Sequence, residues 1–308
     1  MKKIDINSFS TRANQLYQQI IDLSDKEIEI EVDNEKTDSF LNLNQSQHSV
    51  SGEVITIQIT NSPNIEYMLI HELLHIKLDF GDYSKMEFNL FSSDASFNQQ
   101  AQTTAMALKE VIDHRLISEW EQAEKVRDEE IQDSLNQGTS ELLAADGQAV
   151  DDEKLILYRT LIMLDNQYFD QKYPQAYELA QTINESISEV TNKTQYHSAL
   201  VQLFKDFDES IQKYGYIDLL HNQFVTVTPV LSQRQLRLAV NQIFELVHTE
   251  FVNQKNQRPY ILETKSNLQN SGVIEFTQQE TTPEFFQNTY QMKVADLLDK
   301  YQIDYIIR

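Results

Sequence analysis

The sequence predicts an α+β fold that is mostly helical. Its 308 residues include 6 glycines and 5 prolines, well below average usage, which favours long helices over a turn-rich all-β fold. Two short segments, 27–32 and 54–60, instead alternate apolar and polar residues, as half-buried strands do. Hydrophobic residues make up 40% of the chain and aromatic residues 10%, so the chain can bury a proper core without disulfides.

Charge and cysteine content narrow the possible functions. The chain has 25 basic and 48 acidic residues, a net charge of −23, and no basic stripe, so we expect neither nucleic acid nor an anionic membrane surface as a partner. The first residues lack an apolar signal core and no segment approaches the length of a membrane span, which favours the cytoplasm. Because there are no cysteines, a metal site must use histidine and carboxylate ligands.

The first half of the chain predicts a helix followed by two strands. Residues 8–23 carry apolar side chains at helical spacing, with serines before them that can cap a helix. The alternating segment 27–32 follows, and then residues 33–52, which are rich in Asn, Gln and Ser and predict a loop or a hairpin excursion. The second strand, over 54–60, leads directly into a helix with a metal-binding motif.

That helix contains the motif His71-Glu72-Leu73-Leu74-His75, the His-Glu-x-x-His pattern of zinc hydrolases. Residues four apart lie about one turn above each other in an α-helix, so both imidazoles can reach one Zn²⁺ ion. Glu72 is turned about 100° from His71, where it can reach a water bound to the ion and act as a general base. The alternative interpretation is a buried helix whose two histidines only find hydrogen-bond partners.

The residues around the motif indicate a helix with two different faces. Ser62 can cap its N-terminus, Pro63 fits the first helical position and Gly81 suits the C-terminal stop. On a helical wheel one side can enter a core and the other can line a site. The core side holds Leu69, Leu73, Ile76 and Phe80 with Ile65 at its margin, and the site side holds Asn64, Met68, His71, His75 and Leu78.

The order of elements over residues 1–125, together with His71-Glu72-Leu73-Leu74-His75, resembles the N-terminal half of a zincin metallopeptidase. The resemblance implies a small sheet packed on the metal-site helices, Zn²⁺ as the cofactor and a peptide or protein substrate. Residues 76–81 contain no third histidine, unlike the metzincins, and Leu74 replaces a glycine that is usual in the branch that cleaves repressors. The gluzincin-like type, in which a later helix supplies a carboxylate ligand, is the closest match.

A helical pattern over residues 102–135 offers three candidates for the third ligand. Glu110 and His114 are four apart and Asp113 flanks them, so one turn can supply both a ligand and a residue that orients a ligand. The gluzincin resemblance favours Glu110 as the ligand, with His114 as its polar neighbour. Asp113 or His114 could instead bind the metal directly while Glu110 orients a histidine.

We expect three parts: a zincin-like metal domain over 1–135, a helical region over 154–255 and a small C-terminal α/β segment over 256–308. Residues 119–133 are heavily charged and predict a solvated face, and residues 136–153 hold two glycines and an acidic cluster, which suggests a boundary. The remaining patterns predict an irregular connection over 82–100, helices over 154–182, 183–212 and 231–254, a strand or linker over 224–229, a strand over 273–276, a helix over 283–301 and a strand over 305–307.

These patterns predict a zinc-dependent peptidase. His71 and His75 bind Zn²⁺, a carboxylate from the second helix completes the site, and the fourth position holds water. Glu72 takes a proton from this metal-activated water and passes it to the leaving nitrogen. The competing hypothesis is a non-enzymatic protein that keeps its metal for stability or acts as a helical interaction module. The strand over 54–60 is expected to be either an edge strand that pairs with an extended substrate or an interior strand. The oxyanion donor and the oligomeric state stay open.

Overall fold

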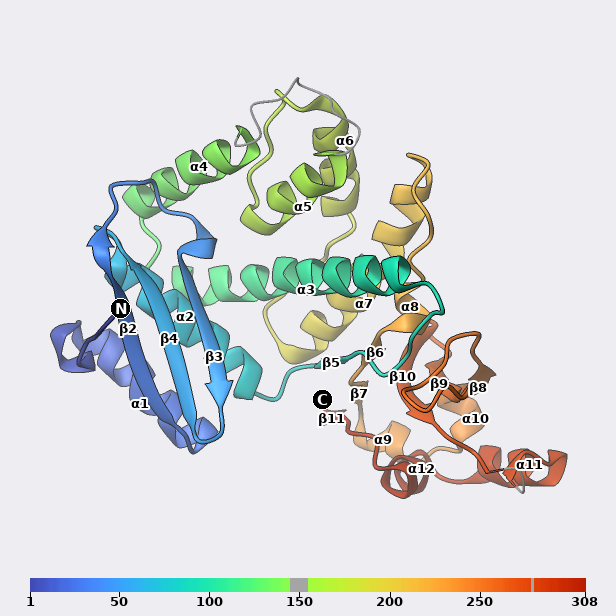
Figure 1. Cartoon of the computed structure of the whole chain (residues 1–308). Helices are drawn as coiled ribbons and strands as arrows, with labels where there is room; N and C mark the ends of the chain where they lie inside the picture. The colour runs from blue at the N-terminus through green and yellow to red at the C-terminus, as the bar shows by residue number, and fades with distance from the viewer. Residues whose placement is uncertain (145–154, 278–279) are drawn as a thin grey trace. The chain divides into compact units, whose positions relative to one another are not determined.

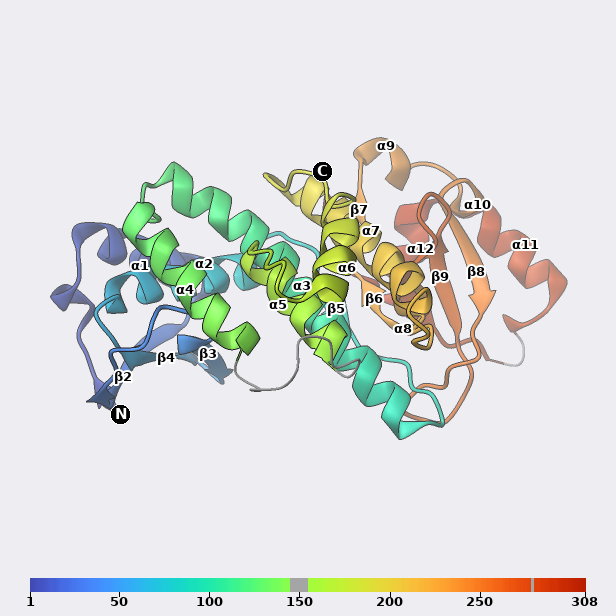
Figure 2. The same ribbon diagram turned by 90° about the horizontal axis from the view of Figure 1, so that it is seen from above.

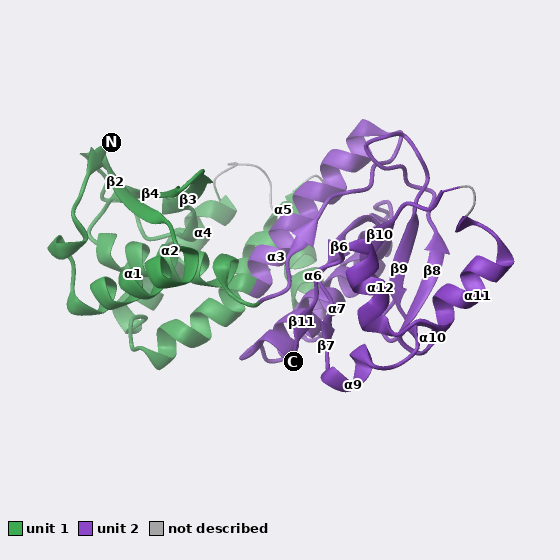
Figure 3. Cartoon of the chain, turned by 90° about the horizontal axis from the view of Figure 1, so that it is seen from below, with its two compact units in different colours: residues 1–82, 113–181 green, residues 83–112, 182–308 purple. Residues whose placement is uncertain are grey.

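The computed structural model describes residues 1–144, 155–277 and 280–308. The chain divides into two compact units, residues 1–82 with 113–181 and residues 83–112 with 182–308 (Figure 3). About half of the described residues lie in helices, and the rest include one four-stranded sheet, one three-stranded sheet and two pairs of short strands, which confirms the α+β class. The units do not follow the expected division at 135 and 255, because the chain leaves the first unit after residue 82 and returns to it at residue 113.

The first unit is built on a mixed four-stranded sheet. Its strands are ordered β1 (Lys2–Lys3), β2 (Glu27–Lys36), β4 (Val54–Asn61) and β3 (Ser46–Ser51), and the last three lie side by side in Figure 1. β2 and β4 run parallel, whereas β1 and β3 pair with their neighbours antiparallel. Alternation correctly predicted both long strands, since one side chain in two is buried: Ile28, Ile30, Val32, Ile55, Ile57 and Ile59.

The position of β4 within this sheet decides between the two interpretations of segment 54–60. β4 pairs with β2 on one side and β3 on the other, so the edge-strand expectation is wrong and the strand is interior. The edge is β3, which comes from the polar segment 33–52 and forms a hairpin with β4. The hairpin interpretation of that segment is therefore confirmed for its second part.

Helices α1 (Thr11–Ser24) and α2 (Ile65–Phe80) pack with this sheet in one hydrophobic core, which also includes Ile117 and Leu135. α2 begins two residues later than expected, because its N-cap position is Asn64 and neither Ser62 nor Pro63 belongs to the helix. Gly81 ends it as predicted, in extended rather than left-handed backbone. Leu69, Leu73 and Ile76 of the core side are buried, and Phe80 and Ile65 are half-buried. Three residues of the other side are buried as well: Met68, His71 and Leu78.

The helical pattern over 102–135 is two helices rather than one. α3 (Ala95–Ala123) ends before a turn in which Lys125 has a φ of 55°, and α4 (Glu129–Ala144) follows. The first part of the predicted boundary at 136–153 is helix, and residues 145–154 lie outside the described residues. Gly138 serves close packing there, since a Cβ would collide with the backbone carbonyl of Leu41.

The remaining short elements complete the two units. The first contains 3₁₀ helices η1 (Ile6–Ser8) and η2 (Leu43–Gln45), α5 (Ile156–Asn166) and most of α6 (Pro174–Asn184). The second contains α7 (Lys193–Gln212), α8 (His221–Phe224), α9 (Gln233–Leu236), α10 (Val240–Ile243), α11 (Pro283–Gln291) and α12 (Val294–Tyr301). None of the helices in the described ranges is both long and apolar enough to cross a bilayer.

The second unit has its own sheet and core. Strands β10 (Gln269–Ile274), β9 (Tyr260–Thr264) and β8 (Phe244–His248) form an antiparallel sheet, with β8 and β9 side by side in Figure 2. The single helix expected over 231–254 is therefore wrong: its first half contains the two short helices α9 and α10, and residues 244–248 pair with β9 as a strand. Two small pairs add β5 (Met86–Glu87) to β6 (Thr226–Val227) and β11 (Ile306–Ile307) to β7 (Val230–Leu231), which confirms the short C-terminal strand.

Candidate metal centre

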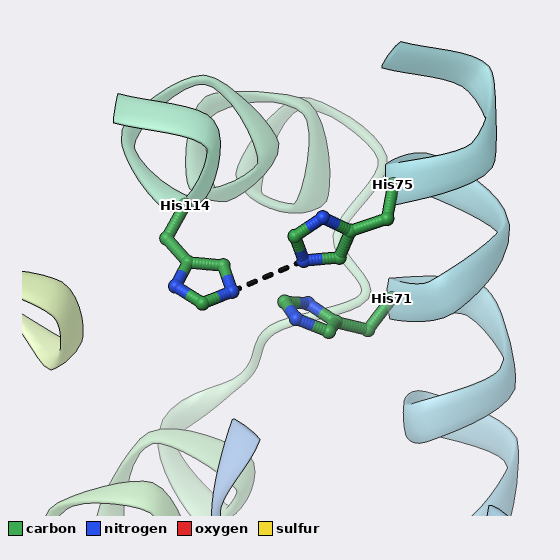
Figure 4. Close-up of side chains that lie close together, drawn as sticks. All are labelled: His71, His75 and His114. Carbon is green, nitrogen blue, oxygen red and sulfur yellow. Dashed lines mark hydrogen bonds between the residues drawn. The ribbon is translucent and has the colours of Figure 1, made fainter. Parts of the chain in front are cut away.

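Three histidines of the first unit converge on one point. His71 and His75 project from successive turns of α2, and His114 of α3 faces them (Figure 4). The Nε2 atoms of His114 and His75 are 3.0 Å apart, and one ring nitrogen from each of the three histidines lies within 4.8 Å of the others. Tetrahedral Zn²⁺ with Zn–N bonds of 2.0–2.1 Å separates its ligand nitrogens by roughly 3.3 Å, so the cluster has a suitable size for the ion.

The environment of His71 is the clearest test of whether these residues fit a metal. His71 is 3% exposed, and its Nδ1 lies 2.8 Å from Oε1 of Glu121. Because a carboxylate can only accept, Nδ1 carries the proton and Nε2 presents a lone pair. That Nε2 is buried and has no hydrogen-bond partner among the described residues. A buried polar atom without a partner is costly unless something binds it, and a metal ion would do so.

Glu121 is held as an acceptor by a network of its own. It is fully buried, accepts a hydrogen bond from the Tyr67 hydroxyl at 3.1 Å, and lies 3.6 Å from Nη1 of Arg127. Burial raises the pKa of Glu121, but the interactions with His71, Arg127 and Tyr67 outweigh it, so the net pKa is below its ordinary value. Glu121 therefore stays ionised and orients His71.

The burial of Glu121 corrects the prediction of a solvated face over 119–133. Glu121 follows His114 by seven residues, which is two helical turns, so both side chains lie on the same side of α3. The many charged residues of the segment favoured a solvated face, and the seven-residue spacing from His114 was not considered. Most neighbours of Glu121 on the C-terminal side are exposed, as expected.

His114 has a carboxylate partner as well. Its Nδ1 lies 2.6 Å from Oδ1 of Asp165 in the last turn of α5, and its Nε2 is directed at His75. A histidine that donates one ring N–H to a carboxylate and offers the other nitrogen to an ion is the usual arrangement at a metal centre. Asp165 was not predicted, because no sequence pattern links it to a residue 51 positions earlier.

The two carboxylates considered as third ligands precede His114 on α3. Asp113 is buried, at 2% exposure, and belongs to the first unit; Glu110 is exposed and belongs to the second. The three-histidine cluster draws all its members from the first unit, and two of the three, His71 and His114, are buried.

Glu72 lies next to His71 on α2 and is held by a residue from the edge strand. Its Oε1 is 2.6 Å from Nδ1 of His48 on β3, and Nε2 of His48 is 3.1 Å from Oδ2 of Asp79. Burial lowers the pKa of His48, but the hydrogen bonds and charges of Asp79 and Glu72 outweigh it and raise the pKa to about 9. No sequence pattern singled out His48, because it lies in a polar segment without ligand spacing.

Comparison with known proteins adds no relative. No protein-family model matches the chain, and neither a curated protein nor a solved structure matches it. The zincin resemblance therefore continues to depend on His71-Glu72-Leu73-Leu74-His75 and the order of elements, and it stays a prediction. What the chain possesses independently of any relative is a small mixed sheet with two helices packed on it and a three-histidine cluster.

Proposed function

We propose that this chain is a zinc-dependent peptidase in which His71, His75 and His114 bind the metal and Glu72 is the general base. The observation that carries the proposal is the buried, unpartnered Nε2 of His71 within 4.8 Å of the ligand nitrogens of the other two histidines. An all-imidazole set suits Zn²⁺, and in catalytic sites three protein ligands leave a fourth position for water. His114 replaces Glu110 as the preferred third ligand, with Glu110 and Asp113 as the alternatives.

The protein residues have separable roles in this proposal. Bound Zn²⁺ would supply a Lewis acid that lowers the pKa of a water ligand towards 7 and polarises a substrate carbonyl. Glu72 accepts the proton of the attacking water and returns it to the leaving nitrogen, so its charge is restored after each turnover. Glu121 and Asp165 keep the proton on Nδ1 of His71 and His114, so that both Nε2 lone pairs stay available.

The peptide or protein substrate is the part of the proposal that comes from the zincin resemblance. The fold adds one supporting feature, since β3 is an edge strand and its residue His48 contacts the proposed base, Glu72. An extended peptide can add a strand to such an edge through backbone hydrogen bonds. A cytoplasmic location, expected from composition, belongs to the proposal as well.

One observation favours a second candidate, a metal that only stabilises the fold. Glu72 is 5% exposed and already engaged with His48, which is what a packed structural site would show. A structural zinc site has four protein ligands and no exchangeable water, whereas a catalytic site keeps a position open. The acidic ligand alternatives, Glu110 and Asp113, are the residues that could supply a fourth ligand.

The deciding experiment replaces Glu72 by Gln. We expect Glu72→Gln to keep one zinc per chain and to lose peptide hydrolysis by roughly 100-fold to 10,000-fold, the usual contribution of a general base. The measurements are metal analysis and cleavage of a mixed peptide library by zinc-loaded protein. Glu66→Gln, the same change in the first turn of α2, is the matched control and should leave both unchanged.

The outcomes separate the candidates. Full activity in Glu72→Gln would show that Glu72 is not the base. Zinc-loaded wild-type protein that cleaves no peptide, with tight stoichiometric zinc and no exchangeable water, would favour the stabilising metal. If the protein binds no zinc on titration, both the peptidase and the stabilising-metal candidate are refuted, since each requires the metal.

A further inference from the structure

The edge strand β3 places one histidine against α2. In the register of the sheet His48 is directly opposite Ile57 of β4, and residues opposite each other in an antiparallel pair share a face. Ile57 is fully buried in the core that includes α2, so this row of the sheet faces the helix. An apolar residue would be the ordinary choice in such a row, and His48 is instead a titratable one.

Two carboxylates of α2 meet this ring. Glu72 and Asp79 are seven residues apart, so they follow one another along the same side of the helix. Nδ1 of His48 lies 2.6 Å from Glu72 and Nε2 lies 3.1 Å from Asp79. Because ionised carboxylates only accept hydrogen bonds, both ring nitrogens must donate, and His48 is an imidazolium. Its raised pKa, about 9, agrees with this assignment.

Building on the proposed function, we propose that His48 is a positioning residue for the general base: it holds Oε1 of Glu72 and is itself held by Asp79. Oε1 carries the contact to His48, and Oε2 of Glu72 makes no hydrogen bond among the residues that the structure describes. Oε2 is therefore the oxygen left to accept the proton of the attacking water. A charge-assisted hydrogen bond as short as this one restrains the carboxylate strongly.

His48 restrains Glu72 without exchanging a proton itself. It keeps both of its own protons throughout, and one proton passes from water to Glu72 and from Glu72 to the leaving nitrogen.

The test compares two variants with a control on another element. We expect His48→Gln to lower kcat roughly 10–100-fold, the range for residues that orient a catalytic group, with KM and zinc stoichiometry unchanged. Asp79→Asn, which removes the charge of the tether and keeps the ring, should lower kcat by less. Gln18→Ala is the control, since Gln18 is exposed on α1, away from β3 and the histidine cluster.

Nitrogen-15 NMR of the imidazole rings gives a readout that does not depend on turnover. In zinc-loaded wild-type protein near neutral pH, both ring nitrogens of His48 should be protonated, and Glu72→Gln or Asp79→Asn should return the ring to a neutral tautomer. A neutral His48 in the loaded wild-type protein would overturn the proposal. If His48→Gln fails to fold, the kcat and NMR spectrum of Asp79→Asn decide in the same way.

Failure of this inference differs from failure of the proposed function. Unchanged kcat in a folded His48→Gln protein, with Glu72→Gln inactive, would overturn the positioning role and leave the peptidase standing. Wild-type protein that binds zinc and cleaves no peptide would refute the peptidase, and the positioning role for catalysis would be refuted with it.

Discussion

His71 in the first unit and His221 in the second are both buried histidines paired with a carboxylate, but their second nitrogens have different surroundings. Nδ1 of His71 lies 2.8 Å from Glu121, and Nδ1 of His221 lies 2.7 Å from Asp208. Nε2 of His221 donates to the backbone carbonyl of Ala101 at 3.2 Å, whereas Nε2 of His71 has no partner among the described residues.

The aromatic neighbours of the two histidines also differ. The ring of His71 lies 4.9 Å from that of His75 and 5.2 Å from that of His114, so its neighbours are further possible ligands. The ring of His221 stacks on Phe204 at 5.3 Å, and phenylalanine is not a metal ligand. A histidine–carboxylate pair alone is therefore no sign of a metal centre. The unused lone pair and the converging nitrogens are what distinguish the first unit.

The largest expected effect is the loss of zinc binding when a ligand histidine, rather than His221, is replaced. His71→Ala, His75→Ala or His114→Ala should each weaken zinc binding by well over 100-fold, because loss of a ligand exceeds the effect of losing a residue that only orients one. His221→Ala should leave zinc affinity unchanged and destabilise the fold by roughly 3 kcal/mol, since it leaves Asp208 buried without its partner. Competition with a chelator measures the first effect and urea unfolding the second.

The same titration decides the third ligand. If Glu110→Ala or Asp113→Ala weakens zinc binding more than His114→Ala does, the carboxylates hold the metal and the three-histidine assignment is wrong. Because imidazole binds a metal only in its neutral form, zinc affinity of the wild-type protein should also fall in acid.

A second prediction uses histidines whose pKa values move in opposite directions. The pKa of His48 in the first unit is raised to about 9, whereas burial lowers the pKa of His197 in the second to about 4. A raised histidine pKa stabilises the fold below pH 6.5 and loses that contribution as the pH rises through about 9. A lowered histidine pKa costs stability as the pH falls from about 6.5 through 4.

Each shift corresponds to roughly 3 kcal/mol of pH-dependent stability. In metal-free protein, His48→Gln should therefore flatten the alkaline side of the stability profile and His197→Gln the acid side, as measured by urea unfolding across pH. The unchanged side of each variant is the control for the other. An alkaline side that is as steep in His48→Gln as in wild type would contradict the imidazolium between Glu72 and Asp79.

The third effect compares the two carboxylates. Glu121→Gln replaces a carboxylate, which can only accept, by an amide that can also donate, so the tautomer of His71 is no longer fixed and zinc affinity should fall roughly 10–100-fold. Asp208→Asn makes the matching change in the second unit and should leave zinc affinity unaltered. Equal effects of the two variants on zinc binding would mean that general loss of stability, rather than the orientation of His71, is being measured.

How far the sequence could predict this site depended on whether its parts are close along the chain. His71, Glu72 and His75 follow from spacing on one helix, and β2 and β4 follow from alternation, because both signals are local. His114 was only one of three possibilities, since a helix stripe does not show which member meets another helix. The pairing of His114 with Asp165 is tertiary and has no local signal.

Two wrong predictions, for Glu121 and for β8, concern residues whose sequence pattern did indicate the observed structure but was outweighed by another pattern. Glu121 is two turns from His114, which places it on the site face, but the surrounding charges favoured a solvated interpretation. In β8, Phe244 and Leu246 are buried on alternate positions, yet the apolar residues before them also suit a helix and extended the helical prediction. β3 was missed as a site element because its one functional side chain, His48, is set by register with β4.

The smallest expected effect extends the comparison to carboxylates that face each other. Glu263 of β9 lies directly opposite Glu245 of β8 in the second unit. Burial and the charge of Glu245 raise the pKa of Glu263, whereas the interactions of Glu121 with His71, Arg127 and Tyr67 lower the pKa of Glu121. Like charges opposite each other in a sheet are destabilising, so Glu263 weakens its unit when ionised.

Glu263→Gln should therefore stabilise the protein by roughly 0.5 kcal/mol at neutral pH, since it removes one of two facing charges. The gain should disappear as the pH falls, because a raised carboxyl pKa means that protonation relieves the same repulsion in the wild-type protein. Glu245→Gln should give a similar gain, and the double variant should give little more than either, since one substitution already ends the repulsion. Additive gains in a urea-unfolding cycle would show that the two carboxylates do not interact and that burial alone raises the pKa of Glu263.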